Sequence, residues 1–152
     1  MKTRGASNAD TDLRLSPWEL LKTDNFTPQF LLPEESNKIL TFMSIIKEAF
    51  SEETSSFEEE VNTKKYKHYL EYVILPMDLS KIERRIANRY YRSIDSLRSD
   101  SELIALNAGL FNEKNSFICE SSEKLKGYMS IILSNIDNPV QHILSLLLKN
   151  KN

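Results

Sequence analysis

The sequence predicts an all-α domain of four main helices, with an unusually long connection after the first. Three observations favour this fold class: apolar residues recur at spacings of three and four, the 152 residues include only 3 glycines, and the balance is 40% hydrophobic to 28% charged. Such a chain is too apolar for disorder and too poor in glycine for a fold with many tight turns. Its length favours one domain with one core.

The first helix is predicted to begin at Pro33, because Glu34 and Glu35 then place acidic side chains in its first turn. An apolar stripe at helical spacing follows and indicates about five turns. Its members are Ile39, Phe42, Met43, Ile46 and Phe50.

The helical period disappears from Ser51 to about Leu75. A connection of some 25 residues is far longer than the usual loop between helices, and such loops are commonly functional or disordered. This one carries many apolar residues, so we expect it to be ordered and packed. They are Phe57, Val61, Tyr66, Tyr69, Tyr72, Val73 and Ile74.

Polar residues mark the start of the three helices that follow. Asp78 is a candidate cap for a short helix, and Ser93 or Asp95 can cap the next. A break at residues 112–115 precedes the last main helix, which begins at Ser116. The expected inward side chains of the three helices are Leu79, Ile82 and Ile86, then Ile94, Leu97, Ile104 and Ala108, then Ile118, Leu125, Met129 and Ile132.

The helical body is therefore predicted to span residues 33–138. Residues 1–32 form an N-terminal extension that we expect to pack partly on the bundle through Trp18 and its apolar neighbours. Residues 139–152 follow Pro139 and are predicted to form a C-terminal helical extension.

Charge indicates the class of partner that the protein can bind, and cysteine content indicates its compartment. A net charge of -2 and a pI of about 5.8 do not favour direct nucleic-acid binding and suit a basic partner better. Cys119 is the only cysteine, which indicates a reducing compartment. No apolar run approaches the roughly 18 residues of a membrane span, so we expect a soluble intracellular protein with no membrane partner.

Signals for an enzyme are nearly absent. The two histidines, His68 and His142, are far apart, and the chain has no glycine-rich phosphate loop or nucleophile elbow. The run of acids at residues 58–60 fits a solvated rim better than a metal site. We expect no catalysis, no metal and no cofactor.

The long connection and the break after the third helix share one end of an up-down bundle. Aromatic residues of the connection and the amide of Asn112 could therefore line one pocket. An asparagine between helices can equally be a simple cap or turn residue, and spacing alone leaves both interpretations open.

Three segments resemble the bromodomain family: PMDLSKIERRI at 76–86, NRYYRS at 88–93 and LIALNAGLFNE at 103–113. The similarity covers roughly residues 35–135. Within the family it is most similar to the first bromodomain of WD-repeat bromodomain proteins, supported also by SPWE at 16–19. The resemblance implies a left-handed four-helix bundle.

The resemblance also implies an acetyl-lysine site. Asn112 would hydrogen-bond the acetyl carbonyl, Tyr69 would reach it through an ordered water, and Phe111 would back the asparagine. Ile118 would hold the gatekeeper position and Phe57 the shelf position. Val61 and Tyr66 would form further parts of the pocket wall. Ser56 and Lys67 replace two prolines that the family usually has, which should make the loop less preorganised.

The function implied is a nuclear, monomeric reader of acetylated histone tails that recruits a chromatin-associated complex. Small molecules that mimic acetyl-lysine would compete for its pocket. Unmodified lysine would bring an ammonium into a site without an anionic partner, so desolvation would discriminate against it. The alternative is a scaffold of the same fold that packs against other proteins and reads no mark.

Overall fold

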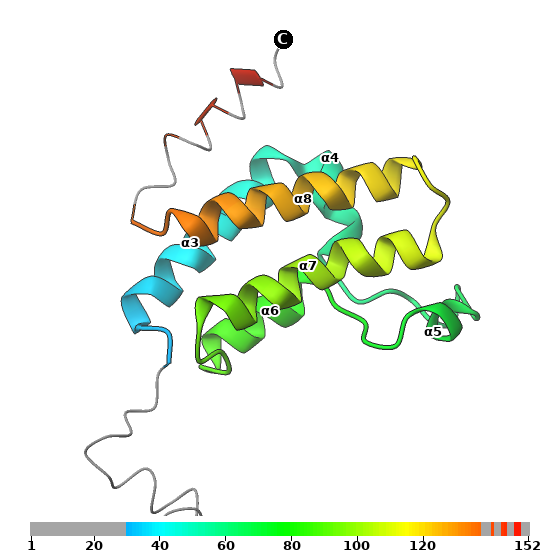
Figure 1. Cartoon of the computed structure of the whole chain (residues 1–152), viewed down its shortest axis with the longest axis horizontal. Coiled ribbons are helices and arrows are strands. Elements are labelled where there is room, and N and C mark those ends of the chain that lie inside the picture. Colours follow the sequence, from blue (N-terminus) through cyan, green and yellow to red (C-terminus); the bar gives the residue numbers. More distant parts are fainter. Residues whose placement is uncertain (1–29, 138–140, 142–143, 146–147, 150–152) are drawn as a thin grey trace, which may run out of the picture.

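The computed structural model describes residues 30–137, 141, 144–145 and 148–149. The all-α prediction is confirmed, and no strand occurs among these residues (Figure 1). Four main helices form the bundle: α3 (Pro33–Ala49), α6 (Leu79–Ala87), α7 (Ile94–Phe111) and α8 (Phe117–Ser134). The long connection holds three short pieces: α4 (Ser51–Thr54), the 3₁₀ helix η1 (Ser55–Phe57) and α5 (Tyr69–Tyr72). No described helix is long and apolar enough to cross a membrane.

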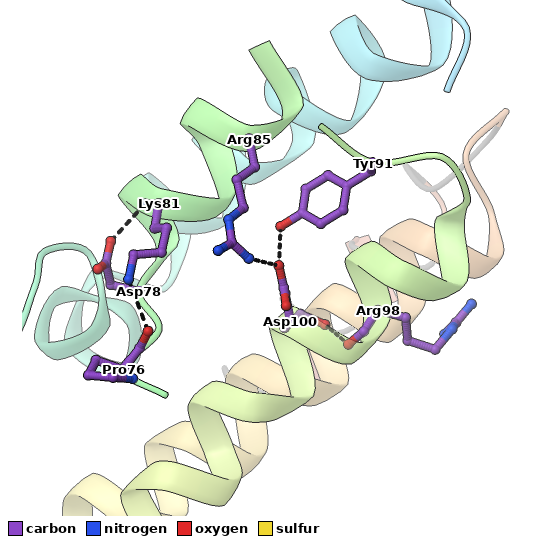
Figure 2. Close-up of polar contacts among 8 residues, drawn as sticks. Pro76, Asp78, Lys81, Arg85, Tyr91, Arg98 and Asp100 are labelled. Carbon is purple, nitrogen blue, oxygen red and sulfur yellow. Dashed lines mark hydrogen bonds and ion pairs between the residues drawn. The ribbon is translucent and has the colours of Figure 1, made fainter. Parts of the chain in front are cut away.

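The polar residues predicted at the start of three main helices all act as caps. The Asp78 carboxylate accepts a hydrogen bond of 2.8 Å from the backbone N–H of Lys81 (Figure 2). Of the two candidates for α7, Ser93 is the cap, and its hydroxyl accepts from the N–H of Ser96 at 3.2 Å. Ser116 caps α8 in the same manner. Each bond satisfies an N–H that the first turn leaves without a helical partner.

One hydrophobic core lies between α3, α6, α7 and α8. Its fully buried members come from every main helix and fall on the predicted stripes; they include Ile39, Met43, Ile46, Leu79, Ile82, Leu97, Leu125, Met129 and Ile132. The α7 and α8 helices lie side by side, and the connection passes along one end of the bundle (Figure 1). That end is where α7 stops and α8 starts.

The expectation that the connection packs throughout is only partly correct. Phe57, Tyr69 and Val73 are buried, but Tyr72 is 57% exposed and Ile74 is 89% exposed. The α5 helix is a single turn, so only one of its faces can contact the bundle. Ile118 is 37% exposed, because it sits in the first turn of α8, beyond the core.

The two predicted extensions lie mostly outside the described residues. At the N-terminal border, Leu31 is buried in the core cluster and its N–H donates to the Tyr91 carbonyl at 3.4 Å. Trp18 and the rest of residues 1–29 lie outside the described part, as do most of residues 138–152. The domain limits at 33 and 138 therefore remain predictions.

Candidate functional site

A cavity of about 370 Å³ opens between the long connection, the C-terminal part of α7 and the first turn of α8. All seven residues predicted for the site line it: Phe57, Val61, Tyr66, Tyr69, Phe111, Asn112 and Ile118. They come from two segments, residues 57–69 and 111–118, that are more than 40 residues apart in sequence, and the bundle topology brings them together.

Asn112 occupies the C-cap of α7 and is half-buried. Its backbone N–H and its side-chain Nδ2 both donate to the Ala108 carbonyl, each at 3.0 Å. A side-chain amide has two N–H donors and one carbonyl, so one donor and the Oδ1 remain without a partner among the described residues. Asn112 thus caps its helix and still presents a donor at the cavity, and the two interpretations of this residue are compatible.

Phe111 is the centre of an aromatic group that holds the connection against α7. Its ring makes edge-to-face contacts with Tyr69 at 4.9 Å, Tyr72 at 6.0 Å and Tyr66 at 6.1 Å between centroids. Such pairs contribute about 0.5 to 1.5 kcal/mol each beyond area burial. Two of these tyrosines, Tyr66 and Tyr69, also line the cavity.

Tyr69 brings a phenol to the cavity wall. The side chain is 6% exposed, and burial raises the pKa of its hydroxyl above the ordinary value. The hydroxyl is therefore neutral at physiological pH and able to donate as well as accept. It has no hydrogen-bond partner among the described residues, so it is available to a ligand or a water molecule.

The remaining walls are largely apolar. Phe57 is 9% exposed at the end of η1, Val61 is half-buried, and Ile118 faces the opening from α8. Met77, Ile104 and Ala108 also line the cavity and were not predicted as site residues. Ile104, Ala108 and Phe111 lie at spacings of three and four on α7. This spacing is visible in the sequence, but it indicates a core position as well as it indicates a cavity wall.

Asn107 is a site residue that sequence reasoning missed. It is 4% exposed, lines the cavity and donates a hydrogen bond of 2.8 Å from Nδ2 to the Leu75 carbonyl. The loop is held at a second point, where the Ser80 N–H donates to the Glu58 carbonyl at 3.0 Å. These two bonds fix the connection between its apolar anchors.

The expectation that no anionic group faces the site is wrong. Glu59 and Glu60 line the cavity, although both are exposed and therefore hydrated. These two acids form a solvated rim, as the sequence indicated, whereas Glu58 is half-buried. Among the described residues, no three His, Cys, Asp or Glu side chains gather as metal ligands would.

The structure also bears on the serine that replaces a proline before Phe57. Ser55 has φ -57° and ψ -37°, the helical conformation that a following proline disfavours. Ser56 therefore allows η1 to continue directly from α4, where a proline would oppose that backbone.

The family follows from a comparison with known proteins. A family model described as Bromodomain matches residues 37–124, more than half of the chain. This chain belongs to the bromodomain family. The bromodomain is a reader module rather than an enzyme family, and it generally binds acetyl-lysine in chromatin proteins.

Three curated relatives show the range of the similarity. A bromodomain and WD repeat-containing protein of Dictyostelium discoideum is 31% identical over 72% of this chain and 5% of its own length. Human bromodomain and PHD finger-containing protein 3 is 28% identical over 57% of the chain and 7% of its own length. Chromatin structure-remodeling complex subunit rsc4 of Schizosaccharomyces pombe is 30% identical over 51% of the chain and 14% of its own length. This bromodomain thus spans a small fraction of the relatives that it matches.

Proposed function

We propose that the cavity binds the acetyl-lysine side chain of histone tails, with Asn112 as the donor to the acetyl carbonyl. The observation that carries this is the unused amide donor of Asn112 at an apolar cavity, beside the buried Tyr69 hydroxyl. Tyr69 is assigned to a water-mediated contact with the same carbonyl, and Phe111 to support behind Asn112.

The chemistry of the ligand fits this cavity. Acetylation replaces the lysine ammonium by a neutral amide on an apolar stem. Phe57, Val61 and Ile118 can bury the stem, with Tyr66 at the outer wall, and one amide donor satisfies the carbonyl. Unmodified lysine would have to desolvate an ammonium to enter, and that costs several kcal/mol unless it is fully paired. The hydrated Glu59 and Glu60 at the rim offset only part of this cost.

The cellular role proposed is recruitment of a chromatin-associated complex in the nucleus. One relative is named a subunit of a chromatin structure-remodeling complex, and others combine a bromodomain with WD repeats or a PHD finger. We propose that the domain acts as a monomer and that small molecules mimicking acetyl-lysine compete for the same cavity. No catalytic step is assigned to it.

The alternative is a scaffold that binds a protein and reads no mark. It is favoured by the exposed apolar side chains of the connection, which include Leu70 at 57%, Ile74 at 89% and Leu75 at 64% exposure. Exposed apolar side chains that gather in one patch often contact another protein.

The two functions are separated by titration calorimetry with one histone tail peptide in acetylated and unacetylated forms, after a peptide array has identified the preferred acetylated sequence. The reader function predicts heat only with the acetylated peptide. Equal behaviour of both forms across the whole array would leave the scaffold as the function.

A further inference from the structure

We infer that the surface around Arg89 and Arg92 binds the phosphate backbone of duplex DNA. The choice of DNA as the partner rests on the proposed function, because histone tails emerge from particles wrapped in DNA. The surface consists of Arg89 and Arg92 with the exposed rings of Phe30 and Tyr90, and is called the arginine surface below.

Basic side chains are concentrated in one segment, although the net charge of the whole chain is slightly negative. All five arginines of residues 30–137 fall between Arg84 and Arg98, and residues 81–98 contain six basic side chains against two acidic ones. The chain as a whole has a net charge of -2. The composition argument against nucleic acid therefore does not apply to this part of the surface.

Two of the guanidinium groups share one aromatic ring. Arg89 and Arg92 each lie 5.7 Å from the centroid of Phe30, which is 37% exposed. A guanidinium that stacks on a ring keeps its N–H groups at the edge of its plane free for bidentate contacts with phosphate. The ring thus gathers two cations on one surface without using their hydrogen-bond donors.

Arg89 and Arg92 have no carboxylate partner in the part of the chain that the structure describes. No ion pair involves Arg84, Arg89 or Arg92 among the described residues, whereas Arg85 pairs with Asp100 at 2.6 Å. Arg89 also adopts a left-handed backbone with φ 56°, which asparagine or glycine adopts at lower cost. Backbone preference therefore does not account for an arginine at this position.

The base of the arginine surface is fixed by the buried Tyr91 and by a partly buried ion pair. Asp100 accepts hydrogen bonds of 2.6 Å from both Arg85 and the Tyr91 hydroxyl (Figure 2). The Tyr91 ring is 2% exposed and its carbonyl accepts from Leu31, so the segment that carries Arg89 and Arg92 is held at its centre. The Arg85 guanidinium also lies over the exposed Tyr90 ring at 4.5 Å.

A hollow of about 440 Å³ adjoins Arg92 and offers room for a phosphate group. The Ser96 and Ser99 side chains lie on its wall with Tyr90. Among the described residues, the carboxylate that lines it is Asp100, which is already paired with Arg85. Hydroxyl and guanidinium donors together are typical of contacts to a nucleic-acid backbone.

The arginine surface and the acetyl-lysine cavity lie at opposite ends of α7. The loop at residues 88–93 precedes the first residue of that helix, and the cavity surrounds its last turns. A helix of 18 residues is about 27 Å long. One domain could therefore contact DNA and a histone tail at the same time without competition between the two ligands.

The test is fluorescence anisotropy with two short labelled duplexes of unrelated sequence at low salt. Both should bind with similar affinity, and the logarithm of the binding constant should fall with the logarithm of salt concentration by about 0.9 per phosphate contact. The variant Arg89→Gln/Arg92→Gln should bind about tenfold more weakly and reduce that slope by about two. The control Lys64→Gln/Lys67→Gln makes the same change in net charge on exposed residues of the connection and should bind as the wild type does.

Three outcomes would overturn the inference: no binding by the wild type at low salt, equal binding by the folded Arg89→Gln/Arg92→Gln variant, or tighter binding of a poly-glutamate peptide than of DNA. The last outcome would identify an acidic protein as the partner. The variant Asn112→Ala should keep DNA binding while it loses acetylated peptide. Failure of the reader function is therefore seen in the peptide titration and failure of this inference in the anisotropy.

Discussion

The Asn107 side chain donates a hydrogen bond of 2.8 Å to the main-chain carbonyl of Leu75, thirty-two residues earlier in the chain. This bond ties the C-terminal end of the long connection to α7. Because Asn107 is 4% exposed and lines the cavity, the amide links the fold to the shape of the site.

We therefore expect Asn107→Ala to destabilise the domain by about 1 to 3 kcal/mol, because the Leu75 carbonyl loses its buried partner. Chemical denaturation measures this loss, and affinity for acetylated peptide should fall as the loop wall loosens. Leu106→Ala is the neighbouring control, since that side chain is 60% exposed. Equal stability of the two variants would mean that the bond does not hold the connection.

The buried Tyr91 predicts a loss of stability in alkali. Burial, reinforced by the hydrogen bond to Asp100, raises the pKa of its hydroxyl far above the ordinary value of about 10. The folded state therefore retains a proton that the unfolded state releases. Its contribution to stability is complete below about pH 10 and is lost as pH rises toward the folded pKa.

Tyr91→Phe tests this directly. At pH 7 the variant should be less stable by about 1.5 to 3 kcal/mol, because a hydrogen bond to a charged group is lost. Between about pH 9 and 11, the free energy of unfolding should fall less steeply in the variant than in the wild type. Parallel curves from denaturant titrations across this range would show that Tyr91 does not carry the effect.

The exposed acids at the rim of the cavity predict a salt-dependent affinity. Glu59 and Glu60 line the cavity and would lie beside a bound lysine- and arginine-rich tail, and salt screens exposed charges. Acetyl-peptide binding should weaken as salt rises, and Glu59→Gln/Glu60→Gln should weaken it at low salt and flatten that dependence. Glu102→Gln/Glu123→Gln, at exposed positions of α7 and α8, serves as the control of equal charge. A dependence that is the same in all three proteins would exclude a role for the rim.

Much of the fold could be predicted because its signals are local. Helix caps such as Asp78, Ser93 and Ser116 and the apolar stripes act within a few residues, and the structure agrees with them. The structure of the long connection was harder to predict, because its apolar residues follow no helical or strand period. Whether Tyr69 is buried and Tyr72 exposed depends on which face of the single-turn helix α5 meets α7, and that is a tertiary property.

Some of the site residues could likewise be predicted from the sequence, and others could not. The resemblance to the family predicted seven site residues, and all of them line one cavity. Asn107 was missed because a buried asparagine within a helix has no sequence signal that separates it from a surface one. The arginine surface was missed because net charge averages over the chain, whereas the contacts of Arg89 and Arg92 with Phe30 appear only in three dimensions.

The chain offers a matched control for the central residue. Asn112 and Asn135 are both C-cap residues, and each donates from Nδ2 to the carbonyl four residues earlier at 3.0 Å. Alanine at either position removes the same cap hydrogen bond, with a similar small loss of stability. Only Asn112 lies at the cavity.

The most direct measurement is therefore titration calorimetry of the wild type, Asn112→Ala and Asn135→Ala with one acetylated histone tail peptide, alongside thermal melts. We expect Asn112→Ala to lose about 1 to 3 kcal/mol of binding free energy, enough to erase the signal of a weak reader, while Asn135→Ala binds as the wild type does and both variants stay folded. Retention of wild-type affinity by a folded Asn112→Ala variant would contradict the account.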